Sequence, residues 1–411
     1  NGASCVGTRR IDKISRIILS IYKNLRMKRG HLNMKKRWIP ILSGVLALSV
    51  ALAGCGNSGD ASEAASTGGS ASASATSTNS DGKLDKVVIQ DKWLPQAQFM
   101  GYYVADKKGF YKDEGIEVEI VPGSSDFTAE DQVINGTANF GHTWYSSLLT
   151  YQESGNDLIN IAQLYQKSAL ELVAKKDSGI TSGKDLKGKK VGNWFGGNEY
   201  EIYALLGKYG YDKDKDVNLV QQDFTMDAFN NGEIDAASAM TYNELGLVVG
   251  DDESKVKDYN IIDMNDEGVA MMEDCLCVSK KWAEENKDLV VRFLRASLKG
   301  WQYACAHTDE AAQIVWDAGQ SVSLEHQKWM AKKVAETVCP SGMDPKDIGK
   351  MDDTALQQTI DLGVKYGLLK SKVDLSTSVD KSYWTEATSS MGDSETAGSA
   401  AASSEAASTA A

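Results

Sequence analysis

The sequence predicts an α/β protein with two lobes, each a mostly parallel sheet flanked by helices, and a ligand cleft between them. Strand patterns alternate with helical patterns from Val87 to Val249, as parallel sheets covered by helices require. The pattern starts again after Lys175 and becomes mostly helical after Asp274. The region that can fold is also longer than the roughly 250–300 residues that a single hydrophobic core organises.

Residues 84–174 are assigned to the first part of lobe one. Short runs that alternate apolar and polar residues predict its strands, and apolar spacings of three or four predict its helices. Gly109 offers a left-handed stop for the first helix, and Asp126 is the expected cap of the second. Strands are expected at 87–89, 116–121, 138–140, 160–164 and 171–175, and helices at 99–108, 126–135 and 144–151.

Residues 175–274 are assigned to lobe two, and residues 275–386 to a second, helical part of lobe one. Crossings near Lys175 and near Asp274 would form a hinge, so that bending closes the cleft. In lobe two, strands are expected at 189–192, 217–220 and 234–239, and helices at 198–209, 226–231 and 242–249. The second part of lobe one is expected to hold a strand at 275–278 and helices at 280–285, 289–307, 309–318, 323–337 and 354–366.

The N-terminal region has the composition of a bacterial lipoprotein signal peptide. A basic start at 35–37, an apolar run at 38–53 and small residues before Cys55 predict such a peptide at 34–54. The run is too short for a stable membrane span. Cleavage before Cys55 and lipidation of its thiol would tether the protein outside the cell membrane. The alternative is an ordinary signal peptide followed by a chance cysteine.

Three further segments are expected to lie outside the globular part. Residues 1–33 have no core pattern and indicate a non-native upstream extension, with Met34 as the expected start and Met27 as the alternative. Residues 55–83 are rich in Ser, Ala, Gly and Thr, which predicts a flexible tether. Residues 387–411 have a similar composition and are expected to form a disordered tail.

The charge balance argues against a nucleic-acid partner. The whole chain carries a formal charge of −13, and its basic residues are concentrated at the start, with eleven Lys and Arg against one acidic residue before Cys55. The remainder is therefore strongly acidic, which disfavours binding to nucleic acid or to an anionic lipid surface. This balance is typical of an extracytoplasmic protein.

The cysteines favour neither a metal site nor a defined disulfide. In the globular part, Cys275 and Cys277 have the wrong spacing for a zinc knuckle, and no His lies near them. The simplest interpretation is that the thiols are small buried hydrophobic groups. A disulfide among Cys275, Cys277, Cys305 and Cys339 stays open, because sequence cannot pair them. No metal is expected.

Three segments at predicted strand ends share one chemical character. Residues 93–99, 193–199 and 241–244 combine aromatic rings with amides or carboxylates and contain no Lys or Arg. Ligands of open α/β sheets bind beyond the carboxyl ends of the strands. Aromatic rings can stack on a flat ligand, and Asn and Gln match ring nitrogens and carbonyls. Since a phosphate or sulfonate would need a cation, the composition favours a neutral or cationic heterocycle.

We therefore predict a ligand site without catalytic residues. The stacking candidates are Trp93, Trp144, Phe195 and Tyr242; the full candidate set is Trp93, Gln96, Gln98, Phe99, Tyr102, Trp144, Tyr145, Phe195, Gly196, Gly197, Asn198, Glu199, Tyr242, Asn243 and Glu244. Each has a structural alternative, because Trp93 and Tyr102 could be core residues and Gly196-Gly197 a simple turn. His142, also near a strand end, is as much a structural candidate as a contact.

Several motifs resemble the substrate-binding proteins related to thiamine pyrimidine synthase and to alkanesulfonate binders. They are Lys92-Trp93-Leu94-Pro95, Gly101-Tyr102-Tyr103-Val104-Ala105, residues 108–116, residues 185–192 and residues 231–236. Residues 194–199 and 239–244 most resemble the branch assigned to riboflavin uptake, whereas a sister branch carries thiamine pyrimidine precursors. The resemblance implies a periplasmic-binding-protein fold of type II. It also implies a monomeric receptor without a cofactor that serves an importer with a permease and an ATPase.

The family also contains an enzyme that makes the thiamine pyrimidine, and this is the alternative function. By resemblance, that cytoplasmic enzyme uses a Lys and a His at positions that match Thr143 and Ser147 here, together with iron and pyridoxal phosphate. Because those two residues are absent, we expect no synthase activity. A third possibility is an alkanesulfonate or nitrate binder, which would need a cation in the cleft.

Overall fold

The computed structural model describes residues 83–124 and 126–391; the expected upstream extension, signal peptide, Cys55 and almost all of the tether lie outside these residues. Contacts within the chain divide it into two units, Asn1–Ala71 and Ser72–Ala411. All described residues belong to the second unit, which holds both lobes.

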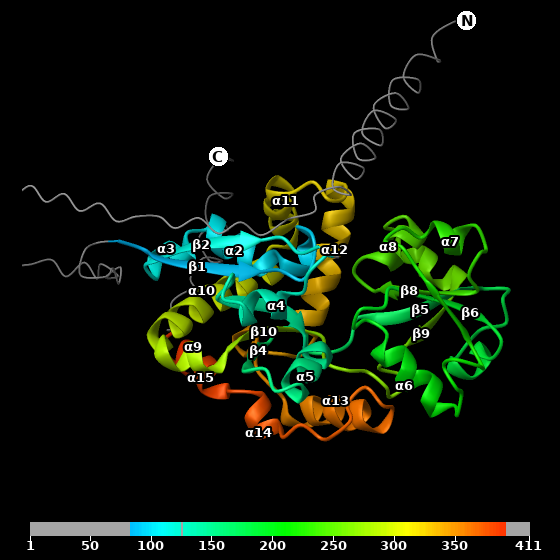
Figure 1. Ribbon diagram of the computed structural model, residues 1–411. Coiled ribbons are helices and arrows are strands. Elements are labelled where there is room, and N and C mark those ends of the chain that lie inside the picture. The colour runs from blue at the N-terminus through cyan, green and yellow to red at the C-terminus, as the bar shows by residue number, and fades with distance from the viewer. Residues whose placement is uncertain (1–82, 125, 392–411) are drawn as a thin grey trace, which may run out of the picture. The chain divides into compact units, whose positions relative to one another are not determined.

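The described residues form two five-stranded sheets, one in each lobe (Figure 1). In lobe one the spatial order is β2 (Ile116–Val121), β1 (Asp85–Gln90), β3 (Phe140–Trp144), β10 (Asp274–Ser279) and β4 (Leu158–Gln163). β1 pairs in parallel with β2 and β3, whereas β10 is antiparallel to β3 and β4. The antiparallel strand is the one that enters from the other lobe.

The sheet of lobe two repeats this arrangement. Its order is β7 (Asn218–Gln221), β6 (Lys190–Asn193), β8 (Ala236–Met240), β5 (Leu170–Lys175) and β9 (Tyr259–Asp263). β6 is parallel to β7 and β8, and β5, which enters from lobe one, is antiparallel to β8 and β9. The structure thus confirms the predicted two-lobed α/β fold with mostly parallel sheets.

Helices cover both sheets, in agreement with strands such as β4 and β8 whose residues are all buried. Lobe two carries α6 (Tyr200–Lys208), α7 (Asp227–Asn230), α8 (Glu244–Val249) and the 3₁₀ turns η2 (Gly183–Leu186) and η3 (Glu253–Asp258). Lobe one carries η1 (Ala97–Phe99), α2 (Met100–Lys107), α3 (Phe110–Asp113), α4 (Ala129–Ile134), α5 (Tyr145–Glu153), α9 (Lys280–Glu285), α10 (Lys287–Ala306), α11 (Thr308–Ala318), α12 (Leu324–Val338), η4 (Pro345–Asp347), α13 (Asp353–Lys365), α14 (Leu375–Ser378) and α15 (Lys381–Ser389).

Four expected boundaries are wrong. β5 pairs with β8 and β9 and so belongs to the second sheet. The first crossing therefore lies at 164–169, and lobe one does not extend to residue 174. The sequence did not indicate this boundary, because the strands that pair with β5 lie far along the chain. Thr128, not Asp126, caps α4: its side chain accepts a hydrogen bond from the backbone N–H of Asp131. α15 continues to Ser389, beyond the expected start of the tail. The strand expected at 138–140 is β3, which continues to Trp144.

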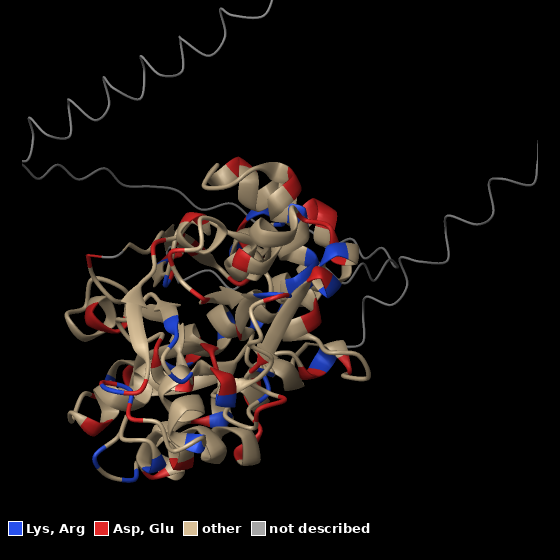
Figure 2. Cartoon of the chain, turned by 90° about the vertical axis from the view of Figure 1, so that its right-hand side faces the viewer, with Lys and Arg blue, Asp and Glu red and all other residues tan. Residues whose placement is uncertain are grey.

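Acidic and basic residues are interspersed over the described chain (Figure 2). Most of their ion pairs are exposed, as between Lys213 and Asp214. Such exposed pairs contribute about 0–1 kcal/mol each, so hydrophobic packing between the layers dominates the stability.

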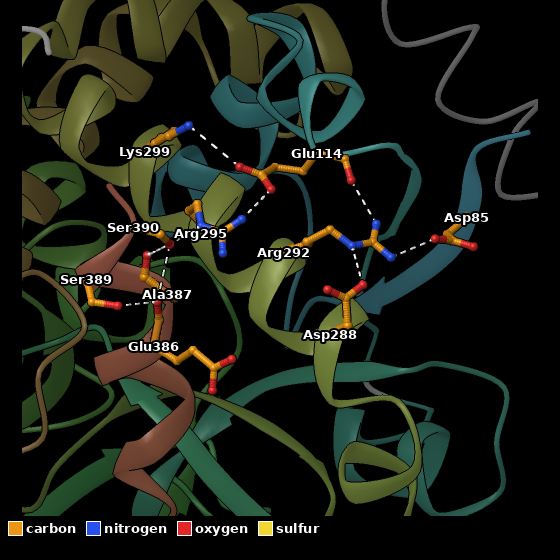
Figure 3. A network of polar contacts seen from close by, with 10 residues as sticks. All are labelled: Asp85, Glu114, Asp288, Arg292, Arg295, Lys299, Glu386, Ala387, Ser389 and Ser390. Atoms are coloured by element: carbon orange, nitrogen blue, oxygen red, sulfur yellow. Dashed lines mark hydrogen bonds and ion pairs between the residues drawn. The ribbon is translucent and has the colours of Figure 1, made fainter. Parts of the chain in front are cut away.

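One partly buried ion-pair network fixes α10 to the first two strands (Figure 3). The guanidinium of Arg292 donates to the carboxylates of Asp85 and Asp288, each at 2.8 Å, and to the backbone oxygen of Glu114 at 2.7 Å. Arg295 pairs with the side chain of Glu114. α10 is therefore held at the start of both β1 and β2, at the sheet end away from the strand carboxyl ends.

Candidate functional site

A pocket of about 410 Å³ lies between the two lobes. Its wall is formed by residues that follow β1, β2 and β3 in lobe one and β6, β7 and β8 in lobe two. Each of these strands contributes its carboxyl end, where open α/β sheets bind ligands. The volume falls in the range of small-molecule sites, about 300–1,000 Å³.

The structure brings most of the predicted site residues to this wall. They come from all three predicted segments and from the end of β3: Trp93, Gln96, Gln98, Trp144, Phe195, Gly196, Asn198, Tyr242, Asn243 and Glu244. Their assembly at one place follows from the strand order, because β1, β3, β6 and β8 all point their carboxyl ends into the cleft.

Five predicted residues are not part of the wall, namely Phe99, Tyr102, Tyr145, Gly197 and Glu199. Phe99 and Tyr102 are fully buried, and both contact the ring of His142 edge-on. The hydroxyl of Tyr145 forms a 2.8 Å hydrogen bond with that of Ser378. Phe99, Tyr102 and Tyr145 are therefore buried core residues of lobe one.

His142 lies inside β3 rather than after it, and it is fully buried. Its Nε2 is 2.9 Å from Oδ1 of Asp274 on β10. The amide of Gln98 also donates to both oxygens of Asp274, at 3.1 and 3.2 Å. Asp274 thereby orients Gln98 in the pocket wall, and His142 has a structural position.

The loop from Asn193 to Glu199 is fixed by its own side chains. The amide of Asn198 donates to the backbone oxygen of Phe195 at 2.8 Å, and the carboxylate of Glu199 accepts from the N–H of Gly197 at 2.9 Å. Phe195, Gly196 and Gly197 all have positive φ, at 58°, 66° and 103°. Glycine adopts this region without strain. Phe195, which is not a glycine, is held in this conformation at the pocket wall by the loop's own hydrogen bonds.

Two aromatic side chains meet across the pocket from opposite lobes. The ring centroids of Trp93 and Phe224 are 4.4 Å apart, with the planes inclined at 44°. Tyr242 lies deeper and packs edge-on against Tyr165 at 5.8 Å. Among the described residues, the indole N–H of Trp144 has no hydrogen-bond partner although it is buried. An unpaired buried donor in a pocket wall is a place for a ligand acceptor.

Charged groups of both signs line the pocket, which the three predicted segments did not suggest. The ammonium of Lys92 lies 5.0 Å from the ring centroid of Trp144. Glu130 on α4 is 2 % exposed and accepts a 2.6 Å hydrogen bond from the hydroxyl of Thr143. Lys92 and Glu130 both line the pocket, so a ligand there would meet a cation and a carboxylate.

Glu244 is a pocket carboxyl whose pKa is shifted into the neutral range. Its carboxylate accepts from the N–H of Met240 at 3.0 Å and from the amide of Asn243 at 2.7 Å. Burial outweighs these bonds and raises the pKa of Glu244 to about 7. Near neutral pH this group therefore exchanges between a neutral acid and an anion.

Several pocket residues were not predicted. They are Lys92, Ser124, Asp126, Phe127, Thr128, Ala129, Glu130, Asp131, Ser147, Trp194, Phe224 and Met240. Lys92 directly precedes a predicted segment, and Trp194 lies inside one. The segments after β2 and β7 are also strand ends, so the rule that found the other segments could have found residues 124–131 and Phe224 as well.

Comparison with known proteins gives the family context. A family profile described as NMT1/THI5 like matches residues 96–311. The riboflavin-binding protein RibY of Chloroflexus aurantiacus is 28% identical over 248 residues, which cover 57% of this chain and 67% of that protein. The formylaminopyrimidine-binding protein of Halalkalibacterium halodurans is 23% identical over 246 residues, covering 58% and 73%.

Two further comparisons concern the fold and the alternative function. The crystal structure of the periplasmic aliphatic sulphonate binding protein SsuA of Escherichia coli matches with a TM-score of 0.53 at 16% identity, covering 72% of this chain and 92% of that one. This match shows that the chain has a periplasmic-binding-protein fold. The phosphate synthase THI13 of Saccharomyces cerevisiae, which by its name makes 4-amino-5-hydroxymethyl-2-methylpyrimidine phosphate, is 23% identical over 232 residues, covering 54% and 68%.

Within residues 83–124 and 126–391, no helix is both long and apolar enough to cross a membrane. In the same part of the chain, no cluster of His, Cys, Asp or Glu has the arrangement of a metal site. The four cysteines described there are free thiols, with Cys275 and Cys277 buried.

Proposed function

The chain belongs to the NMT1/THI5-like family, and we propose that it is the extracytoplasmic solute-binding component of an ABC importer. In this proposal the two lobes close over a flat heterocycle, riboflavin or a thiamine pyrimidine precursor. The observation that carries it is the pocket at six strand ends, lined by aromatic rings and amides from both lobes.

The chemistry of the wall supports a flat ligand with both donors and acceptors. Trp93, Phe195 and Tyr242 offer ring faces from both lobes. The indole N–H of Trp144 and the ammonium of Lys92 would meet carbonyl or ring-nitrogen acceptors of the ligand. The carboxylate of Glu130 would accept from an amino group or a ring N–H. Isoalloxazines and aminopyrimidines carry both kinds of group.

The absorbance spectrum of gently purified full-length protein tests this proposal first, because retained flavin would be yellow. Isothermal titration with riboflavin and with an aminopyrimidine then gives the affinities. We expect micromolar or tighter binding of one of the two. Failure of both to bind would overturn the ligand assignment.

One observation favours a second candidate, an anion binder of the alkanesulfonate type. Lys92 supplies in the cleft the cation that such a ligand needs. Against it stand the pocket carboxylates of Asp126, Glu130 and Asp131, which would repel an anion. A titration with an alkanesulfonate, run beside that with riboflavin, separates the two candidates.

The alternative synthase receives less support from the matched positions. Thr143 is fully buried, and its hydroxyl donates to Glu130, whereas Ser147 lines the pocket. Neither side chain offers the nitrogen of the Lys or His that the family enzyme uses. Formation of the pyrimidine product by purified protein would reverse this assignment.

The proposal also includes a place at the cell surface. A lipid on Cys55 would anchor a monomeric receptor outside the membrane, beside the importer's permease and its cytoplasmic ATPase. In a bacterium that expresses the full chain, Cys55→Ala is expected to move the protein from the membrane fraction to the soluble fraction. Retention of the variant in the membrane fraction would contradict the anchor.

A further inference from the structure

Two chain segments cross between the lobes, residues 164–169 before β5 and residues 264–273 before β10. Two buried carboxyl groups form hydrogen bonds with these crossing segments. Glu201 comes from α6 of lobe two and is 4 % exposed, and Glu273 belongs to the second crossing and is 1 % exposed. We call Glu201 and Glu273 the hinge pair.

The hinge pair ties both crossings together. Glu201 accepts from the backbone N–H of Met271 in the second crossing, at 2.5 Å, and its other oxygen lies 2.8 Å from the hydroxyl of Ser168 in the first. Oε1 of Glu273 accepts from the N–H groups of Ala169 and Leu170, at 3.0 and 3.1 Å. The same oxygen lies 2.9 Å from the Ser168 hydroxyl.

The number of hydrogens at Ser168 requires an extra proton. Its Oγ has hydrogen-bond contacts with two carboxyl oxygens and also accepts from the N–H of Leu170 at 3.1 Å. A serine hydroxyl has one hydrogen, so it can donate to only one of the two carboxyl groups. The other contact is a hydrogen bond only if that carboxyl is protonated and donates to Ser168.

The hydrogen-bond pattern places this proton on Glu201. Oε1 of Glu273 already accepts two N–H bonds, so it is the better acceptor for the Ser168 hydroxyl. The Oε2–H of Glu201 can then donate to Ser168 while its Oε1 accepts from Met271. Every contact at Ser168 is satisfied in this arrangement.

The surroundings favour the retention of a proton by the pair. The charged groups that act on the hinge pair, besides the two members themselves, are Asp263 of β9 and Asp274 of β10, both acidic. The hydroxyls of Tyr165 and Tyr242 lie near Glu273 as well. Burial, more than these charges, raises the pKa of Glu201 to about 8 and that of Glu273 above its usual range.

We propose that the hinge stores one proton between Glu201 and Glu273 through Ser168, and that loss of this proton loosens both crossing segments. Without it, two carboxylates face one hydroxyl and repel each other in a buried site. The lobes would then be less firmly held at alkaline pH than at neutral pH. This inference concerns the hinge and does not depend on the identity of the ligand.

Carbon NMR of the Glu carboxyl groups in the full chain tests the proton directly. We expect the hinge pair to titrate with a midpoint near pH 8, the value toward which the pKa of Glu201 is raised. Glu201→Gln supplies a permanent N–H donor to Ser168, so the single carboxyl that remains, Glu273, should titrate one pH unit or more below the midpoint of the wild-type pair, a tenfold or greater change in the acid constant. Glu171→Gln is the matched control, because Glu171 is also buried but makes none of these bonds.

Hydrogen exchange followed by mass spectrometry tests the loosening. After correction for intrinsic exchange, protection of peptides that cover 164–173 and 266–274 should fall about tenfold or more above pH 8 in the wild type and in Glu171→Gln. Glu201→Gln should keep its protection. A hinge pair that titrates at the ordinary pH of Glu, or protection that does not change with pH, would overturn the proposal.

Discussion

Trp93 of lobe one and Phe224 of lobe two touch across the pocket, with ring centroids 4.4 Å apart. Phe224 is 52 % exposed, so its ring reaches out of its own lobe to make this contact. Large exposed rings that meet a partner in this way often belong to a binding surface. Both rings line the pocket and connect the two lobes, so ligand binding and lobe closure would involve the same two side chains.

Replacement of either ring is expected to weaken riboflavin binding. Trp93→Ala should cost about 1–3 kcal/mol of binding free energy, the range for a lost aromatic stack. Because Trp93 and Phe224 touch, the double variant should lose less than the sum of the two single losses. Isothermal titration measures all three. Leu94→Ala is the control, since Leu94 is exposed and does not line the pocket. Additive losses would show that the rings act independently.

Lys92→Met should separate the two ligand classes. The variant keeps most of the side-chain volume and removes the charge near the Trp144 ring. If an alkanesulfonate binds the wild type, its affinity should fall by at least about 1.5 kcal/mol, as for a lost charge-assisted hydrogen bond. Riboflavin binding should change by less, because the isoalloxazine ring is uncharged. A larger loss for riboflavin than for the sulfonate would contradict this assignment of Lys92.

Glu244 gives a pH prediction. Its pKa in the folded protein is raised to about 7 from an ordinary value of 4.5, so the folded state binds the proton more tightly than the unfolded state. The contribution of Glu244 to stability is then complete below about pH 4.5 and lost as the pH rises through about 7. Glu244→Gln removes this loss. Unfolding free energies at pH 5 and pH 8 should differ less in Glu244→Gln than in the wild type, by up to about 3 kcal/mol.

The position of the pocket could be predicted from the sequence, because strand-end chemistry is local. Trp93, Phe195 and Tyr242 each follow a recognisable strand, and the topology then brings these strand ends together. The direction of a side chain within a helix was harder to predict. Tyr102 follows β1 and Tyr145 follows β3, but both side chains are buried in the core, where they contact His142 and Ser378, which are distant in the sequence.

Long-range pairing explains the other differences. β5 looked like a continuation of lobe one, yet its partners β8 and β9 come 60 or more residues later. The hinge pair has the same origin: Glu201 lies in α6 of lobe two and Glu273 in the crossing that leaves this lobe, far apart in the sequence, and Ser168 joins them. Sequence patterns over a few residues carry no information about contacts between residues that are distant in the sequence.

His326 on α12 provides the last prediction, because it joins that helix to the pocket wall of lobe two. Its Nε2 lies 2.9 Å from Oδ1 of Asn243, and its Nδ1 lies 2.7 Å from Oδ1 of Asp251. The amide of Asn243 in turn donates to Glu244. His326→Ala leaves both partners without this contact, which should cost about 1–3 kcal/mol of unfolding free energy in urea.

The same variant should also weaken ligand binding, because Asn243 lines the pocket and loses the contact that positions it. His307→Ala is the matched control: His307 is exposed and stacks on Tyr303 at the end of α10, away from the pocket. We expect that control to leave both the affinity and the unfolding free energy nearly unchanged. Equal effects of the two substitutions would mean that His326 acts only as a general helix residue and not through Asn243.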